Sequence, residues 1–340
     1  MVGYMKRIKK LLVGTILMSL LFSLVSLPIQ ADDSTEMNST NWMNYISDDT
    51  SLKDITIPGT HDTCSEGIIS AYLPWAQTQD MSITEQLNSG VRLLDFRLKT
   101  TKPIVGQSEL ALYHGASAFE CDCHITYAEA ISEVAQFLVD HPTETVLISL
   151  KYEGSGDIPD KFRQQMSTIL GVYESFKDDP SAPVGVYLDS AIPTLGQVRG
   201  KVVFLNRMYD DIQFGIDYNN AATIEDHYDL FTEEKEGYIE TALQNIENGT
   251  NPTDKAVITF TSTNPITRLY ETVEWYDYAL STVSLKVGSQ MYLARIVYTS
   301  DHINEWLMNR SLDKAKCYGW FFMDYPSSDL IKKIYDVNFQ

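Results

Sequence analysis

Short apolar runs alternate with amphipathic segments along most of the chain. The runs Val91–Arg97, Thr145–Leu150 and Lys201–Arg207 are apolar over most of their length, which is typical of strands buried on both faces of a sheet. A segment between the first two begins at a Thr126–Glu129 capping box and has apolar residues at helical spacing. Strands that alternate with helices in this way predict a parallel sheet in an α/β protein.

The number of runs and the chain length favour a barrel. No Pro-, Ser- or Gly-rich linker and no internal repeat divides the chain, so we expect a single domain, an irregular (β/α)8 TIM barrel. The spacing of Trp42, Met43 and Ile46 predicts a short helix that acts as a lid. Seven strands are predicted and an eighth is not placed; the seven are residues 55–57, 91–97, 110–114, 145–150, 201–207, 256–260 and 319–325.

Polar side chains follow the predicted strands where the apolar runs end. Taken singly, each has an ordinary structural interpretation: a loop cap, a solvated lysine, or an ion pair between Asp95 and Arg97. In a barrel, however, the carboxyl ends of all strands surround one mouth. We therefore expect these side chains to converge there: His61, Asp62, Asp95, Arg97, His114, Lys151, Arg207 and Asp324.

The expected set combines acid–base groups with a cation for phosphate. Two histidines with separate carboxylate partners can serve as a general base and a general acid. Arg97 presents a planar fork that matches a phosphate. The combination predicts in-line attack on a phosphodiester, in which the guanidinium offsets charge on the phosphorus oxygens and no metal or other cofactor is needed.

Seven motifs in the same order resemble one family, the bacterial phosphatidylinositol-specific phospholipases C, over about Trp42 to Tyr335. The resemblance implies an irregular TIM barrel and a lyase reaction that releases diacylglycerol and inositol 1,2-cyclic phosphate. The motifs are Ile57–Asp62 (IPGTHD), Leu94–Arg97 (LDFR), His114-Gly115, Pro142–Lys151 (PTETVLISLK), Gly200–Arg207, Asp226–Tyr228 and Gly319–Tyr325.

The resemblance also implies a role for each matching residue. His61 is similar to the base that takes the proton of the inositol 2-hydroxyl, and Asp324 to the residue that orients it. His114, coupled to Asp62, is similar to the acid that protonates the diacylglycerol oxygen. Arg97 would contact the phosphate, with Asp95 in support. The inositol-binding residues would be Lys151, Arg207, Asp226 and Tyr228, and Tyr228 would stack on the ring.

Two alternatives stay open. One is a metal-dependent phosphodiesterase of glycerophosphodiesters or lysophospholipids, which would resemble a Glu-x-Asp metal site where this chain has Asp95-x-Arg97. The other is a catalytically silent inositol- or glycan-binding module on the cell surface, which would be expected to lack a histidine or Arg97. Free phosphatidylinositol and glycosyl-phosphatidylinositol anchors are not distinguished as substrates.

Charge and the N-terminus indicate where the protein works. Basic residues, an apolar run from Leu11 to Leu27 and a small residue at Ala31 predict a cleaved secretory signal over residues 1–31, with the barrel in 32–340 and an extracellular location. Removing residues 1–31 changes the formal charge from −20 to about −24. Such a surface excludes nucleic acid as a partner and gains nothing from anionic headgroups. The resemblance implies peripheral, transient contact with phosphatidylinositol in membranes, for which Trp75 and Trp275 are candidates. No obligate protein partner is implied.

The four cysteines are ambiguous. Cys121, Cys123 and His124 are too crowded for a zinc site without a second ligand pair. In an exported protein we expect a disulfide instead, with three pairings of Cys64, Cys121, Cys123 and Cys317 left open. Cys64 is not expected to act as a nucleophile.

Overall fold

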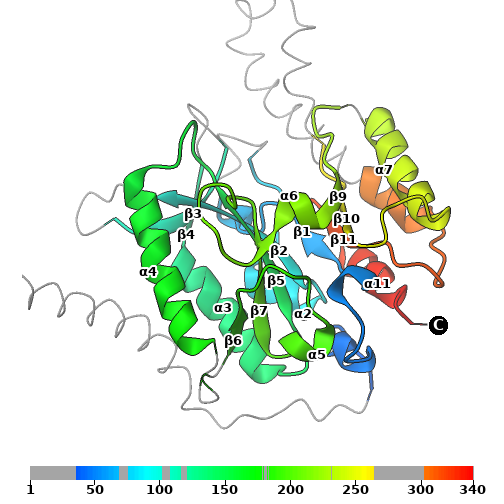
Figure 1. Ribbon diagram of the computed structural model, residues 1–340. Helices are drawn as coiled ribbons and strands as arrows, with labels where there is room; N and C mark the ends of the chain where they lie inside the picture. The colour runs from blue at the N-terminus through cyan, green and yellow to red at the C-terminus, as the bar shows by residue number, and fades with distance from the viewer. Residues whose placement is uncertain are drawn as a thin grey trace, which may run out of the picture.

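Parallel strands form the centre of the protein in the computed structural model (Figure 1). The structure describes residues 36–68, 76–101, 108–115, 121–177, 179, 182, 184–230, 232–263 and 302–339; the predicted signal and both Trp75 and Trp275 lie outside them. Parallel pairing joins β1, β2, β5, β7 and β8 in that order, and β9, β10 and β11 in another series. These strands are β1 (Gly59–Thr60), β2 (Leu93–Thr100), β5 (Val146–Tyr152), β7 (Lys201–Asn206), β8 (Ile216–Asp217), β9 (Ala222–Glu225), β10 (Ala256–Phe260) and β11 (Trp320–Phe322).

The two series join where the first and last strands meet. Parallel bridges pair Ile57 with Trp320 and Thr60 with Met323, and the Met323 amide donates to the Gly59 carbonyl at 3.0 Å. The backbones are so close that a Cβ on Gly59 would lie 2.5 Å from the Phe321 oxygen, so only glycine fits there. The two series are also connected between β8 and β9, where the helix α6 (Tyr218–Ala221) separates the strands. The predicted α/β barrel is therefore confirmed, and this join is where it is irregular.

One predicted barrel strand lies outside the barrel. Residues Leu110–His114 form β3, which pairs antiparallel with the far end of β2 and with β4 (Cys121–Thr126). An apolar run alone cannot show strand direction, so its assignment as a parallel barrel strand was wrong. The places in the barrel are taken by the short strands β8 and β9, in the acidic stretch where no strand was predicted. A further short strand, β6 (Gly185–Tyr187), pairs with the start of β7.

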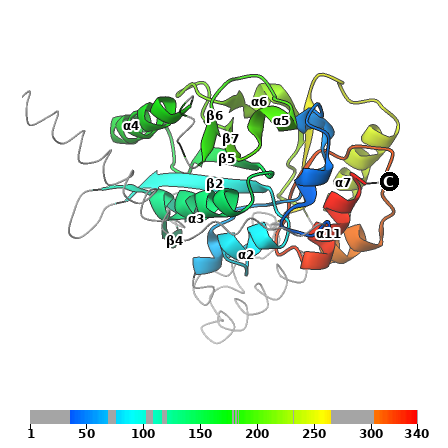
Figure 2. The same cartoon turned by 90° about the horizontal axis from the view of Figure 1, so that it is seen from below.

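Helices cover the outside of the strands, as Figures 1 and 2 show. The Thr126–Glu129 capping box starts α3, and a second box, between Ser82 and Glu85, starts α2, which Gly90 ends with φ 110°. No helix among the described residues is long and apolar enough to cross a membrane. The helices are α2 (Ile83–Asn88), α3 (Tyr127–Asp140), α4 (Asp160–Phe176), α5 (Leu195–Val198), α7 (Thr232–Glu247) and α11 (Ser328–Asp336), with a helical stretch at 302–309 and 3₁₀ turns at Trp42–Tyr45 (η1), Leu52–Asp54 (η2) and Ser65–Gly67 (η3).

The segment predicted as a lid is part of the core instead. Trp42 is fully buried, stacks on Tyr335 at 5.3 Å and donates to the Gly90 carbonyl. Gly90 and the nearby buried pair of Arg92 and Glu144 precede β2 and β5, so η1 lies at the amino ends of the strands. This is the end opposite the catalytic candidates. The lid prediction was wrong because the same spacing of apolar residues is also found in a short helix that is packed into the core.

Candidate active site

The end of β1 positions the first histidine and carboxylate. His61 follows β1 directly, and its amide donates to the Met323 carbonyl at the end of β11. Asp62 then adopts a left-handed conformation, with φ 43°, a conformation that non-glycine residues rarely adopt outside constrained sites. The sharp turn sets the Asp62 carboxylate beside His61, and this carboxylate becomes the centre of the site.

His61 has a carboxylate on each ring nitrogen. Its Nδ1 lies 2.8 Å from Asp324 Oδ1, and its Nε2 lies 3.0 Å from Asp62 Oδ2. Burial on its own would lower the pKa of His61, but the charges of Asp62 and Asp324 raise it above the usual value of 6.5. Because an ionised Asp324 can only accept, the proton stays on Nδ1 and Nε2 is the nitrogen that exchanges protons.

His114 reaches the same carboxylate from the hairpin outside the barrel. Its Nδ1 lies 2.6 Å from the Ala76 carbonyl oxygen, which can only accept, so this nitrogen also carries a proton. Its Nε2 lies 3.2 Å from Asp62 Oδ2, and the centroids of the two imidazoles are 6.0 Å apart. One carboxylate oxygen therefore lies between two Nε2 atoms.

Arg97 contacts three carboxylates of the site and offsets part of their negative charge. Its Nε lies 2.8 Å from Asp62 Oδ1 and 2.9 Å from Asp95 Oδ2, and Nη1 lies 3.6 Å from Glu153. Although burial opposes it, Asp62 and Asp95 raise the pKa of Arg97, which keeps it cationic. The predicted pairing of Asp95 with Arg97 is thus present, but as part of a larger cluster.

Asp95 is the buried anchor of the cluster. Ser149 donates to its Oδ1 at 3.3 Å, and Arg207 Nη1 lies 3.4 Å from the same oxygen. Burial would raise the pKa of Asp95, but Arg97 and Arg207 hold it well below its usual range. The carboxylate therefore stays ionised and can hold two guanidinium groups.

Glu153 is a site residue that the sequence reasoning missed. It follows β5, and its Oε2 lies 2.9 Å from Lys151 Nζ while its Oε1 accepts from the Gly115 amide at 3.0 Å. Despite burial, Arg97 and Lys151 lower the pKa of Glu153. Its spacing of two from Lys151, at the end of a strand, is the signal that could have identified it.

The predicted inositol-binding residues are less closely joined. Arg207 lies over the Tyr218 ring at 4.8 Å, and its Nη2 is 4.0 Å from Asp226 Oδ2. Burial raises the pKa of Asp226. Tyr228 is 59% exposed, and within the described residues no contact joins its ring to the other candidates. The structure thus brings nine of the ten predicted residues into one connected cluster and leaves Tyr228 free to meet a ligand.

One group in this cluster has the geometry to hold a cation. Ligand atoms of His61, Asp62 and Asp95 lie within 4.8 Å of one another. The fit is poor, however, because Arg97 Nε already contacts Asp62 Oδ1 and Asp95 Oδ2. A cation on those oxygens would have to displace the guanidinium or lie beside it, at a cost in like-charge repulsion.

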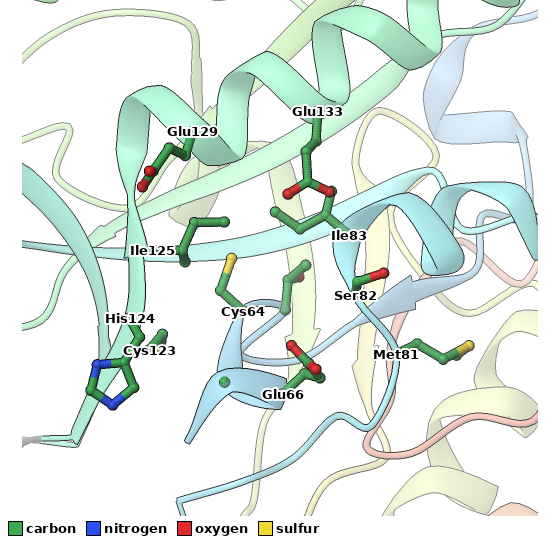
Figure 3. Close-up of a pocket in the computed structure, with 12 residues that line it drawn as sticks. Cys64, Glu66, Met81, Ser82, Ile83, Cys123, His124, Ile125, Glu129 and Glu133 are labelled. Atoms are coloured by element: carbon green, nitrogen blue, oxygen red, sulfur yellow. The ribbon is translucent and has the colours of Figure 1, made fainter. Parts of the chain in front are cut away.

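The expected disulfide is absent, because Cys64, Cys121, Cys123 and Cys317 are all free. Cys64 and Cys123 line a pocket of about 410 Å³ between η3, α2 and the start of α3, and Figure 3 shows the Cys64 sulfur beside Ile125. Burial is the main cause that raises the pKa of both thiols. The disulfide prediction rested on cellular location, which says nothing about the distance between the cysteines.

These features define an α/β barrel with a cluster of two imidazoles, carboxylates and guanidinium groups at its mouth, groups that are able to carry acid–base chemistry. Residues 55–208 match the model of the family described as phosphatidylinositol-specific phospholipase C, X domain. The predicted resemblance to that family is thereby confirmed, and the match includes His61, Asp62, Asp95, Arg97 and His114.

Individual relatives extend the likeness over most of the chain. A protein of Listeria monocytogenes named 1-phosphatidylinositol phosphodiesterase is 27% identical over 312 residues, which cover 87% of this chain and 84% of the relative. A protein of the same name from Staphylococcus aureus strain Newman is 25% identical and covers 91% and 97%.

Solved structures support the fold. The phosphatidylinositol-specific phospholipase C from Listeria monocytogenes aligns with a TM-score of 0.62 at 23% identity, over 89% of this chain and 99% of that one. The Staphylococcus aureus enzyme, from work on its membrane binding, aligns with a TM-score of 0.64 at 22% identity, over 88% and 97%.

Proposed function

We propose that the protein is a phospholipase C that cleaves phosphatidylinositol to diacylglycerol and inositol 1,2-cyclic phosphate. The observation that carries this proposal is the position of Asp62: its Oδ2 lies 3.0 and 3.2 Å from two Nε2 atoms, and its Oδ1 lies 2.8 Å from Arg97. A base, an acid and a cation thus surround one small volume, as in-line displacement at phosphorus requires. The names of the relatives agree with this substrate.

The proposed reaction removes one proton on the attacking side of the phosphorus and adds one on the leaving side. His61 Nε2 takes the proton of the inositol 2-hydroxyl while its oxygen forms a bond to phosphorus. The bond from phosphorus to the diacylglycerol oxygen breaks, and His114 Nε2 gives that oxygen its proton. Asp324 stabilises the imidazolium that forms on His61, since its carboxylate lies 2.8 Å from Nδ1.

The remaining residues hold the substrate. Within the described residues the contacts of Arg97 use Nε and Nη1, which leaves Nη2 for a phosphate oxygen, and Asp95 fixes the guanidinium. The inositol hydroxyls meet Lys151, Arg207 and Asp226, and the exposed ring of Tyr228 stacks on the inositol face. The reaction needs no metal, because Arg97 takes the place that a cation would have on Asp62 and Asp95.

Phosphorus NMR of phosphatidylinositol treated with the protein and a chelator tests this proposal. We expect the cyclic inositol phosphate as the first product, at a rate that the chelator does not change. Loss of activity in the chelator, with the phosphate left on the glycerol of the lipid product, would instead establish the metal-dependent phosphodiesterase, which the candidate cation site at His61, Asp62 and Asp95 favours. Inositol binding without turnover would identify a silent binding module.

We also propose export from the cell through a signal in residues 1–31, followed by transient contact with membranes that contain phosphatidylinositol. The order of basic, apolar and small residues supports cleavage after Ala31. N-terminal sequencing of protein from the culture medium tests this, and a mature chain that still begins near Met1 contradicts it.

A further inference from the structure

A short segment outside the barrel strands contacts the residues at the ends of β1, β3 and β11, which carry the proposed base, the proposed acid and the carboxylate partner of the base. We call this segment, Ala76–Gln79, the strap. The Ala76 carbonyl accepts from His114 Nδ1 at 2.6 Å, and the Thr78 carbonyl accepts from the Tyr325 amide at 2.9 Å. Tyr325 directly follows Asp324, so the strap holds the acid and the partner of the base.

Gln79 makes the most specific of these contacts. Its Nε2 donates at 2.8 Å to the carbonyl of His61 and at 2.8 Å to the carbonyl of Met323, the residue before Asp324. The side chain is fully buried. Rotating the amide would aim its oxygen at two carbonyl oxygens, so only the present orientation is stable. One amide group thus joins the backbones beside His61 and Asp324.

Both backbones adopt a strained conformation beside these contacts. Asp62 and Tyr325 both have positive φ, 43° and 46°, in the turns that follow β1 and β11. Non-glycine residues in this conformation persist only where the surroundings fix them. Thr78 adds a second constraint at the same place, since its Oγ1 donates to the His61 carbonyl at 3.0 Å.

We propose that the strap is the positioning element of both histidines, and that Gln79 sets the contact between His61 and Asp324 by binding both neighbouring carbonyls. This inference rests on the proposed function for its catalytic meaning, but its geometry can be tested alone. If the contact loosens, the charge of Asp324 acts less on His61, and the pKa of His61 falls from its raised value toward 6.5.

Gln79→Met tests the inference, because methionine keeps the length and loses both donors. Gln165→Met is the control: the Gln165 Nε2 also donates to a carbonyl, that of Ser108, and its Oε1 accepts from Thr100, away from both histidines. Both variants should lose stability. Histidine-selective NMR titration, assigned with His61→Leu, should show a fall of about half a unit or more in the pKa of His61 only for Gln79→Met.

The kinetics should separate positioning from binding. For Gln79→Met we expect kcat on phosphatidylinositol to fall about tenfold with KM within twofold of the wild type, because misplaced catalytic groups slow chemistry more than binding. An unchanged His61 titration, or an equal change in the Gln165 control, overturns the proposal. If Gln79→Met does not fold, Thr78→Val decides: a fall in the pKa of His61 supports the strap, and no fall refutes it. Absence of lipid cleavage by the wild type would refute the proposed function, while the titration would still decide the geometry.

Discussion

Removing the charge of Asp324 is the sharpest test of His61 as the base. Asparagine has nearly the same shape, and its Oδ1 can still accept from His61 Nδ1, so Asp324→Asn changes the charge and keeps the tautomer. The contact is 2.8 Å, and the carboxylate is 5% exposed, so solvent screens it little. The His61 imidazolium then loses one of the two carboxylates that stabilise it.

The size of the effect follows from the type of hydrogen bond. A bond to a charged group contributes about 1.5–3 kcal/mol and a neutral one about 0.5–1.5 kcal/mol, so the change costs about 1–1.5 kcal/mol. That is about one pKa unit for His61. The same imidazolium forms in the transition state, so kcat should fall about tenfold.

The pH dependence shows the direction of the change. A base must be neutral, so activity is lost as the pH falls through the pKa of His61, which lies above 6.5 in the wild type. In Asp324→Asn the acid limb of kcat/KM should move about one unit to lower pH. Asp80→Asn, at an exposed carboxylate, is the control and should leave the limb unmoved. An acid limb that stays in place, or moves to higher pH, would refute the assignment.

Three further variants test other parts of the site. His114→Leu should lower kcat on phosphatidylinositol about 10²–10⁴-fold, and much less on an inositol phosphodiester whose leaving group is a nitrophenol, which needs no proton; equal losses on both would contradict its role as the acid. Arg97→Lys should cost at least about 10²-fold in kcat, because a point charge cannot bind Asp62, Asp95 and phosphate together; activity within tenfold of the wild type would show that the fork is dispensable. Glu153 has a lowered pKa, so its charge stabilises the fold above the unfolded pKa of about 4.3 and less as the pH falls through the folded value. Glu153→Gln should therefore lose less stability than the wild type between pH 5 and pH 3 (about 1 kcal/mol less), as followed by urea unfolding; parallel losses would exclude this group as the cause.

Residues at the ends of parallel strands could be predicted because one geometric rule places them. An apolar run gives the strand, and parallel packing brings the carboxyl ends to one mouth. This rule places five residues, since each lies within or at most two residues after β1, β2, β5, β7 or β11: His61, Asp95, Lys151, Arg207 and Asp324. Their convergence needs no knowledge of side-chain contacts.

His114 was placed at the site by an incorrect route. The apolar run predicts that His114 ends a barrel strand, whereas β3 runs antiparallel to the outer end of β2. The long β2 extends beyond the barrel mouth, and the hairpin on this extension returns His114 to Asp62. Strand direction depends on connections and pairing, which a single sequence does not show.

Backbone partners were the hardest feature to predict, and they are what distinguishes the two histidines. His61 has carboxylates on both nitrogens, from Asp62 and Asp324, whereas His114 has Asp62 on one and the neutral Ala76 carbonyl on the other. Any residue type can supply a carbonyl, so composition and spacing give no sign of this contact. The asymmetry nevertheless supports the direction of the reaction, because the positive charge that a base acquires is stabilised from both sides only at His61.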